Sequence, residues 1–257
     1  MQLIMVNGVR LEVERITAPS ESGLAPIVFL HEGLGSVAMW RDWPARLCAA
    51  TGRAGIVYSR RGYGRSDPVP DVRGAGRLPP DYMHHEAWDV LPALLQALDV
   101  REPVLLGHSD GGTIALLHAS RHPVAGCIVM APHVVVEDVS VASISQARDA
   151  YERGDLKGRL ARYHDDVDGA FWQWNDVWLS DAFRSFDIRP ECRAITAPVL
   201  AIQGEDDPYG TLRQVREIAP TAGPFTLQAI AACGHSPHRD QPEAVKAAIR
   251  PFLAPLR

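Results

Sequence analysis

The segment "LLGHSDGGT" (105–113) places one serine in a setting that favours a nucleophile. Ser109 stands between Gly107 and Gly111, directly after an apolar run and directly before a segment of helical periodicity. A sharp strand–turn–helix of this kind strains the central residue and leaves no room for side chains two positions before and after it. The hydroxyl then projects at the carboxyl edge of a sheet and at a helix N-terminus, which favours negative charge. A surface turn would account for the glycines alone.

A histidine further along the chain offers the base that such a serine needs. A serine hydroxyl is a poor nucleophile until a base takes its proton. The segment "ACGHSPH" (232–238) places His235 on a loop after the last predicted strand and just before the final predicted helix. His235 is therefore our candidate base, and His238 is a rival only if the register of this loop is shifted.

An acidic group must orient that histidine and stabilise the imidazolium that forms when it takes a proton. The segment "GEDDP" (204–208) ends a predicted strand with consecutive acidic residues, and Asp207 stands directly before the proline at the start of the loop. We choose Asp207 as the orienting carboxylate, with Glu205 and Asp206 as nearby alternatives.

The elements that must position these residues alternate along the chain. Asn7-Gly8 lies between two alternating runs and supplies the positive φ angles of a two-residue hairpin. Beyond it, continuous apolar runs alternate with amphipathic segments, which indicates strands covered on both faces. The predicted fold is therefore α/β, with a mostly parallel central sheet and helices on both faces. The predicted strands span 26–30, 54–58, 103–107, 126–130, 198–204 and 225–230.

Amphipathic segments between these runs predict the helices. Pro92 falls inside one of them and should kink or split it, because proline lacks the amide hydrogen and clashes with the preceding turn. The predicted helices span 41–50, 82–98, 111–121, 211–218 and 242–253.

The interval 133–197 breaks this alternation. It holds no good strand, its patterns are helical, and it is rich in aromatic residues. An insertion of this size between two strands predicts a helical cap, so we expect a core of 1–132 and 198–257 with a cap of 133–197. Aromatic side chains of such a cap line a pocket or fill the cap's own core. We take Trp172 and Trp178 as candidate substrate contacts.

The chain resembles the α/β-hydrolase superfamily over essentially its whole length. The resemblance implies a cap-bearing α/β-hydrolase fold and a catalytic triad in the chain order Ser109, Asp207, His235. The matching segments, in the order and spacing of that family, are "FLHEGLGS" (29–36), "SRRGYGRSD" (59–67), "GHSDGG" (107–112), "GEDDP" (204–208) and "CGHSPH" (233–238).

The resemblance also implies an oxyanion hole built from backbone N–H groups. One N–H comes from the loop 29–36, and the other from Asp110, the residue after the nucleophile. In the loop the donor is Gly33 or Leu34, and we prefer Gly33. Leu34 is also a candidate substrate contact. Glu32 departs from the family pattern, because a glycine is usual at its position.

Other polar residues near these motifs have structural or pocket-lining interpretations. Ser59 stands where many relatives carry an aspartate. His31 should buttress the oxyanion loop through hydrogen bonds, and His108 should be a structural histidine. His133 ends a predicted strand at the active edge and is a candidate substrate contact. No set of ligands recurs at the spacing of a metal site, so we expect no metal.

A serine nucleophile predicts acyl transfer. Haloalkane dehalogenases and epoxide hydrolases of this fold use an aspartate, so Ser109 argues against both. We expect hydrolysis of a small or medium carboxylic ester through an acyl-enzyme, without a cofactor. A thioesterase, a lactonase and a C–C bond hydrolase on the same triad stay open. A non-catalytic ligand receptor on this fold is the alternative of a different class.

The composition and the net charge of the chain limit the classes of binding partner. The chain has 257 residues, of which 46% are hydrophobic and 22% charged, and a formal net charge of -5. These values are typical of a globular protein and argue against nucleic-acid and membrane partners, so we expect a small-molecule acyl substrate. The N-terminus lacks a secretion-signal pattern and the cysteines are scattered, so we expect a cytoplasmic protein with reduced cysteines. A homo-oligomer is left open.

Overall fold

Residues 1–18 and 23–256 are described by the computed structural model. They form one eight-stranded sheet in the order β1-β2-β4-β3-β5-β6-β7-β8. β1 and β2 pair antiparallel and β2 runs antiparallel to β4, whereas the other neighbouring strands are parallel. The predicted mostly parallel sheet is confirmed. The strands are β1 (Gln2–Val6), β2 (Val9–Ile16), β3 (Ile27–Leu30), β4 (Gly55–Tyr58), β5 (Val104–His108), β6 (Gly126–Met130), β7 (Val199–Gly204) and β8 (Phe225–Ile230).

The expected core of 1–132 and 198–257 includes residues 19–22 and 257, which lie outside the described residues. The sheet begins with the predicted hairpin. Asn7 and Gly8 connect β1 to β2 with φ angles of 49° and 80°, the left-handed values that such a turn requires.

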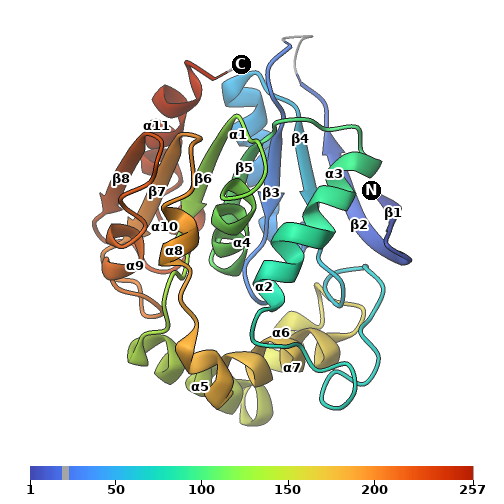
Figure 1. The fold of residues 1–257 in the computed structure, drawn as a ribbon. Coiled ribbons are helices and arrows are strands. Elements are labelled where there is room, and N and C mark those ends of the chain that lie inside the picture. The colour runs from blue at the N-terminus through green and yellow to red at the C-terminus, as the bar shows by residue number, and fades with distance from the viewer. Residues whose placement is uncertain (19–22, 257) are drawn as a thin grey trace.

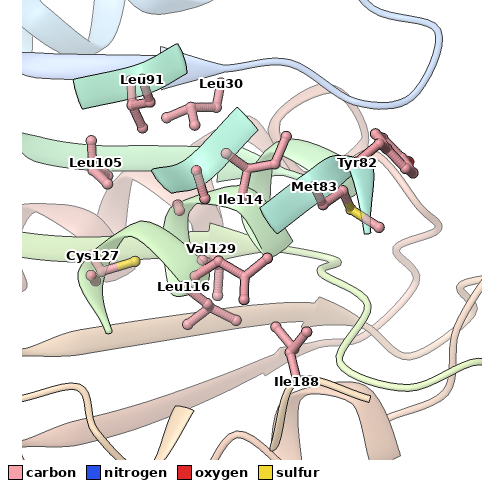
Figure 2. Packing of buried hydrophobic residues seen from close by; sticks show 14 of the residues in the cluster. Leu30, Tyr82, Met83, Leu91, Leu105, Ile114, Leu116, Cys127, Val129 and Ile188 are labelled. Carbon is pink, nitrogen blue, oxygen red and sulfur yellow. The ribbon is translucent and has the colours of Figure 1, made fainter. Parts of the chain in front are cut away.

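Helices cover both faces of the sheet, and each face has its own hydrophobic core (Figure 1). Alternate residues of a strand point to opposite faces, so Leu30 of β3 packs in one core and Phe29 in the other. Figure 2 shows the first core, in which Leu30 lies near Leu91 and Ile114 from the helices. Burial of each such side chain contributes about 1.5–3 kcal/mol. The covering helices are α1 (Trp43–Thr51), α2 (Tyr82–His85), α3 (Leu91–Ala97), α4 (Asp110–Ala119) and α11 (Pro242–Leu253).

The predicted helix 82–98 is split, as its internal proline requires. α2 leads into a π-helical turn over Glu86–Val90 and then into α3, whose second residue is Pro92. Proline has no amide hydrogen for the i−4 carbonyl, and the wider π turn accommodates the break. The split helix still packs against α4. One contact between them is the hydrogen bond that Trp88 Nε1 donates to the Leu117 carbonyl at 2.9 Å.

The predicted helix 211–218 is shorter in the structure, where α9 spans only Arg213–Arg216. Thr211 does not join the helix, since its N–H and hydroxyl donate to the Glu137 carboxylate at 3.0 and 2.8 Å. At the other end, Pro220 disfavours a helical conformation in the residue before it. Tertiary contacts therefore shorten a segment whose periodicity favours a longer helix.

The segment between β6 and β7 is helical. Its helices α5, α6 and α7 lie beyond the carboxyl ends of the parallel strands, at the lower end of Figure 1. In the part of the chain that the structure describes, no helix has the length and apolar character needed to cross a membrane. The helices of the segment are α5 (Asp138–Arg153), α6 (Leu156–Leu160), α7 (Val167–Trp178) and α8 (Arg189–Cys192), with a 3-10 turn over Asp181–Ser185.

A buried histidine in α4 predicts a pH-dependent stability. His118 Nδ1 donates to the Ala87 carbonyl at 2.8 Å, and burial lowers the pKa of His118 to about 4. The unfolded histidine has a pKa of about 6.5, so the unfolded chain binds more protons between these values. The free energy of unfolding should therefore fall as the pH drops through that window.

His118→Gln keeps a hydrogen-bond donor that takes up no proton. Urea unfolding at about pH 7.5 and about pH 4.5 should show a smaller loss of stability in this variant than in the wild type. His85→Gln, at a histidine whose side chain is 59% exposed, is the control and should not reduce the loss. Equal losses in His118→Gln and the wild type would contradict the prediction.

Candidate active site

The candidate nucleophile lies in a strained turn between β5 and α4. Ser109 has a φ of 53° and a ψ of −121°, a conformation that residues other than glycine rarely adopt. A Cβ on Gly107 would collide with the Gly111 carbonyl, and a Cβ on Gly111 would collide with the Leu30 carbonyl. Both glycines are therefore required sterically. The Ser109 N–H donates to the Met130 carbonyl at 2.9 Å, which helps to hold the strained residue in place.

Ser109, His235 and Asp207 form one continuous line of hydrogen bonds. Ser109 Oγ lies 3.0 Å from His235 Nε2, and His235 Nδ1 lies 2.8 and 2.9 Å from the two Asp207 carboxylate oxygens. A carboxylate only accepts, so Nδ1 donates and Nε2 is left to accept from the hydroxyl. The structure thus brings together the residues chosen from the sequence. The alternative acids, Glu205 and Asp206, are exposed.

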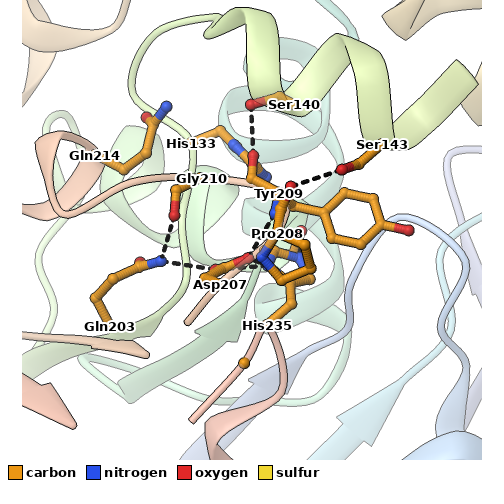
Figure 3. A network of polar contacts seen from close by, with 12 residues as sticks. His133, Ser140, Ser143, Gln203, Asp207, Pro208, Tyr209, Gly210, Gln214 and His235 are labelled. Carbon is orange, nitrogen blue, oxygen red and sulfur yellow. Dashed lines mark hydrogen bonds and ion pairs between the residues drawn. The ribbon is translucent and has the colours of Figure 1, made fainter. Parts of the chain in front are cut away.

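Asp207 is buried and held from several sides (Figure 3). Its side chain is 1% exposed, and its oxygens also accept from Gln203 Nε2 at 2.6 Å and from the Tyr209 N–H at 2.7 Å. Burial alone would raise the pKa of Asp207, but the hydrogen bonds from His235 and Tyr209 lower it below its ordinary value. Asp207 is therefore an anion at neutral pH, with a fixed orientation toward the histidine.

The loop that carries Asp207 is tied to helix α5. Ser140 Oγ donates to the Tyr209 carbonyl at 2.5 Å, and Ser143 Oγ donates to the Pro208 carbonyl at 2.6 Å (Figure 3). The position of the carboxylate thus depends on the helical segment between β6 and β7 as well as on the sheet.

His133 lies beside the imidazole of His235 and stays neutral. Its ring centroid is 5.8 Å from that of His235 and 4.9 Å from that of Trp178. Burial lowers the pKa of His133 to about 3, so its ring adds no positive charge next to His235 at neutral pH. His133 also lines the cavity that contains Ser109.

The loop after β3 is held by a buried arginine. Arg60 Nη1 donates to the His31 carbonyl at 2.7 Å, and Nη2 donates to the Glu32 carbonyl at 3.1 Å. His31 adds a donation from Nδ1 to the Glu32 carbonyl at 2.6 Å and accepts at Nε2 from the Arg60 N–H at 3.0 Å. In a trans peptide the N–H points opposite the carbonyl, so the Gly33 N–H points away from Arg60. Gly33 lines the same cavity as Ser109.

The N–H groups chosen for the oxyanion hole have no competing acceptor. Among the hydrogen bonds between described residues, none uses the Gly33 N–H. Asp110 is the first residue of α4, and such a residue has no i−4 carbonyl within its helix. Glycine is required in the loop, because a Cβ on Gly33 would collide with the indole of Trp174 in α7. Both groups are thus free to donate to an atom bound at Ser109.

The side chain of Asp110 joins a buried polar cluster around Arg60. Asp110 Oδ2 accepts from the Tyr82 hydroxyl at 2.5 Å and lies 4.0 Å from Arg60 Nη2. Burial raises the pKa of Asp110, and Arg60 opposes that effect. Burial alone would lower the pKa of Arg60, but neighbours that include Tyr63, Asp110 and Glu86 raise it. Arg60 therefore compensates buried carboxylates while it holds the loop after β3.

Glu32, at the position where the family pattern has glycine, links the loop after β3 to the loop of His235. Glu32 Oε2 lies 3.2 Å from His108 Nδ1, and His108 Nε2 donates to the His235 carbonyl at 2.6 Å. Burial alone would raise the pKa of Glu32, but His108 and Arg239 hold it well below its usual range. His238, the rival base, is buried, and neither of its ring nitrogens bonds to a described residue.

The cavity at the triad has a volume of about 200 Å³ and mostly apolar walls. Leu34 and Trp178, two of the predicted substrate contacts, line it, whereas Trp172 is not among the residues that line it. Trp172 packs instead with Arg73, whose guanidinium carbon is 4.0 Å from the ring centroid. Trp174 lines the cavity together with Trp178, because residues four apart in a helix share one face. Trp172, two residues before Trp174, lies on another face.

Among the described residues, no three or more His, Cys, Asp and Glu side chains lie close enough together to hold a metal ion. All four cysteines are free and buried.

Several supporting residues escaped the sequence analysis. Gln203 carried a usable signal, since it is a polar residue inside the apolar run 198–204 and a buried amide needs partners. Arg60 stands beside Arg61 in the motif, and nothing in the sequence shows which of the two is buried. Trp172 and Trp174 lie on different faces of α7. Which face points to the cavity depends on how the helix packs.

Comparisons with known proteins give consistent matches. A model described as the alpha/beta hydrolase family matches residues 27–248. A bifunctional esterase/perhydrolase of Acinetobacter calcoaceticus is 27% identical over 217 residues, which cover 71% of this chain and 75% of that protein. Non-heme chloroperoxidase CPO-A1 of Kitasatospora aureofaciens is 25% identical over 232 residues, which cover 77% of this chain and 81% of that protein. The crystal structure of an enol-lactonase from Burkholderia xenovorans LB400 has a TM-score of 0.74 and 23% identity, and the match covers 98% of this chain and 99% of the other.

Removal of the buried arginine should destabilise the protein. Arg60→Met leaves the carboxylates of Asp110 and Glu86 without their cation and the oxyanion loop without its donors, so the free energy of unfolding should fall by about 3–5 kcal/mol. Arg61→Met, at the exposed neighbouring arginine, is the matched control and should change it by less than about 0.5 kcal/mol. Urea unfolding measures both, and equal stability of the two variants would refute this role of Arg60.

Proposed function

Because the chain belongs to the alpha/beta hydrolase family, we propose that it is a serine hydrolase that cleaves a small or medium carboxylic ester through an acyl-enzyme. The observation that carries the proposal is the line of hydrogen bonds from Ser109 Oγ through His235 to the Asp207 carboxylate. Relatives named as esterase and hydrolase support the reaction class.

The first half-reaction transfers the acyl group to the enzyme. Ser109 Oγ attacks the ester carbonyl carbon while His235 Nε2 takes the hydroxyl proton, and Asp207 stabilises the imidazolium. The oxyanion of the tetrahedral intermediate accepts from the N–H groups of Gly33 and Asp110, and one such donor contributes about 3–4 kcal/mol. The intermediate collapses as His235 gives the proton to the departing alcohol.

The second half-reaction releases the acid. A water attacks the acyl carbon while His235 takes its proton, and the second tetrahedral intermediate collapses as His235 returns that proton to Ser109 Oγ. Arg60 acts as a positioning residue. Its hydrogen bond to the Glu32 carbonyl fixes the orientation of the Gly33 N–H before negative charge develops on the substrate oxygen.

We assign the segment 133–197 the role of a cap over the core of 1–132 and 198–257. Helix α7 supplies Trp174 and Trp178 to the cavity, and helix α5 holds the loop of the acidic residue. A cavity of about 200 Å³ with apolar walls fits a small or medium, partly apolar acyl or alcohol group.

Replacement of the nucleophile tests the proposal. The wild type should hydrolyse 4-nitrophenyl esters of short acyl chains, and Ser109→Ala should lower kcat by about 10⁴–10⁶-fold. Ser120→Ala is the control and should keep full turnover, because Ser120 follows the same helix and its hydroxyl donates only to the Leu117 carbonyl.

Turnover that persists in Ser109→Ala would exclude this serine as the nucleophile. Serine-dependent turnover of a thioester, a lactone or a vinylogous diketone, without turnover of simple esters, would refute the proposal that the scissile bond is an ester. It would still support Ser109 as the nucleophile. Binding of these compounds without any turnover would favour a ligand receptor.

The tryptophans of α7 give a matched pair. Trp174→Ala enlarges the cavity and should shift the optimum of kcat/KM to longer acyl chains, by about fourfold for each methylene that gains a buried position. Trp172→Ala, whose indole packs outside the cavity, should leave the optimum where it is in the wild type. A series of 4-nitrophenyl esters of increasing acyl length measures both profiles. Equal profiles for the two variants would place the acyl group away from Trp174.

A further inference from the structure

The active-site cavity adjoins a second cavity, because four residues line both of them. The second cavity has a volume of about 170 Å³. The second cavity therefore lies next to the space in front of Ser109, with part of its wall in common. These shared walls are Met39, Leu156, Arg159 and Leu160.

The second cavity is lined by arginines that come from distant parts of the chain. Arg41 follows the 3-10 turn Val37–Trp40, and Arg239 lies in helix α10 (Pro237–Asp240), which follows the loop of His235. Arg159 lies in α6, and Arg162 follows that helix. We call the cavity with these side chains the arginine pocket. It is a concentration of positive charge in a chain whose net charge is -5.

Carboxylates offset this charge only in part. Arg159 Nη1 lies 3.5 Å from the Asp155 carboxylate, in a pair whose side chains are 61% and 80% exposed. Arg239 Nη2 lies 3.8 Å from Glu32 Oε1 and also donates to the Met39 carbonyl at 2.8 Å. The exposed pair of Arg159 and Asp155 is weak, so Arg159 keeps the capacity to bind another anion. Arg239 is shared with Glu32, whose side chain is only 17% exposed.

The other two arginines have no acidic partner. In residues 1–18 and 23–256, no carboxylate oxygen lies within 4.0 Å of a guanidinium nitrogen of Arg41 or Arg162. Arg41 also has a φ of 55° and a ψ of −136°, where glycine would be free of strain. A long cationic side chain is therefore held at the pocket at a conformational cost.

We propose that the arginine pocket binds an anionic group, a carboxylate or a phosphate, that the substrate carries at the end remote from its scissile bond. Guanidinium groups match the geometry of both anions and bind them with paired hydrogen bonds. The shared apolar walls, Met39, Leu156 and Leu160, would hold an apolar stretch between the two ends. This assignment rests on the proposed function, because it names the substrate class of the same site.

Matched pairs of substrates test the charge. The 4-nitrophenyl half-ester of glutaric acid is compared with its methyl ester for charge on the acyl side. 4-Acetoxybenzoate is compared with its methyl ester for charge on the leaving group. Acetyl-coenzyme A is compared with S-acetyl-N-acetylcysteamine for phosphate. The charged member of at least one pair should have a kcat/KM roughly tenfold higher, and salt raised from about 0.05 M to about 0.5 M should reduce that preference.

Variants identify the groups that confer the preference. In Arg41→Gln/Arg162→Gln the ratio of kcat/KM between the charged and neutral members should fall toward one. Arg250→Gln is the control, since this exposed arginine lies in α11, away from the arginine pocket, and its ratio should stay at the wild-type value. A ratio near one in every pair for the wild type, or an unchanged ratio in the double variant, would overturn the proposal.

A binding measurement separates failure of this proposal from failure of the proposed function. Tryptophan fluorescence in Ser109→Ala follows the binding of glutarate against monomethyl glutarate, and of coenzyme A against pantetheine. Tighter binding of the more anionic member, lost in the variant that also carries Arg41→Gln/Arg162→Gln, would support the arginine pocket even if no ester is hydrolysed. Equal binding of both members, with serine-dependent turnover of neutral esters, would refute the arginine pocket alone.

Discussion

The start of helix α4 lies against the backbone of strand β3 because Gly111 has no side chain. A Cβ at that position would overlap the Leu30 carbonyl, and a Cβ on Gly107 would overlap the Gly111 carbonyl. This close approach sets Ser109 beside the loop that follows β3, so that Gly33, Ser109 and Asp110 line one cavity. The arrangement of the candidate site depends on this contact, because a shift of α4 would move Ser109 and Asp110 away from Gly33.

Charge around the cavity is arranged so that only some groups are free to act. Arg60 is buried and donates hydrogen bonds to backbone carbonyls. Its positive charge also compensates the Asp110 carboxylate. His133 is kept neutral by burial, and Asp207 is kept ionised by its hydrogen bonds. Arginine side chains gather in the neighbouring arginine pocket, away from these groups. The proposal of an anionic group at the far end of the substrate rests on this separation.

Much of this organisation could be predicted from the sequence because it rests on local patterns. Continuous apolar runs predicted the parallel strands, and Asn7-Gly8 predicted the hairpin, since both patterns reflect the conformation and burial of neighbouring residues. The glycines around Ser109 predicted the tight turn for the same reason. The positions of the serine, the aspartate and the histidine, each after a strand, predicted that all three lie at one edge of the sheet.

Contacts between distant segments could not be predicted in this way. The interruption at Glu86–Val90 followed from Pro92, but the shortening of α9 depended on Thr211 binding Glu137 across the fold. Trp174 faces the cavity instead of Trp172, because the phase of a helix against its neighbours depends on packing.

The sequence by itself determined the elements and the chemistry of the serine, because these depend on residue types at short spacing. Only the tertiary structure decided which arginine is buried beside the loop after β3 and which arginines gather in the neighbouring cavity. Arg41, Arg159 and Arg239 lie far apart in the chain, and no local pattern marks them as a group. Their association arises from the packing of α6 and α10 around the loop after β3, which folding alone establishes.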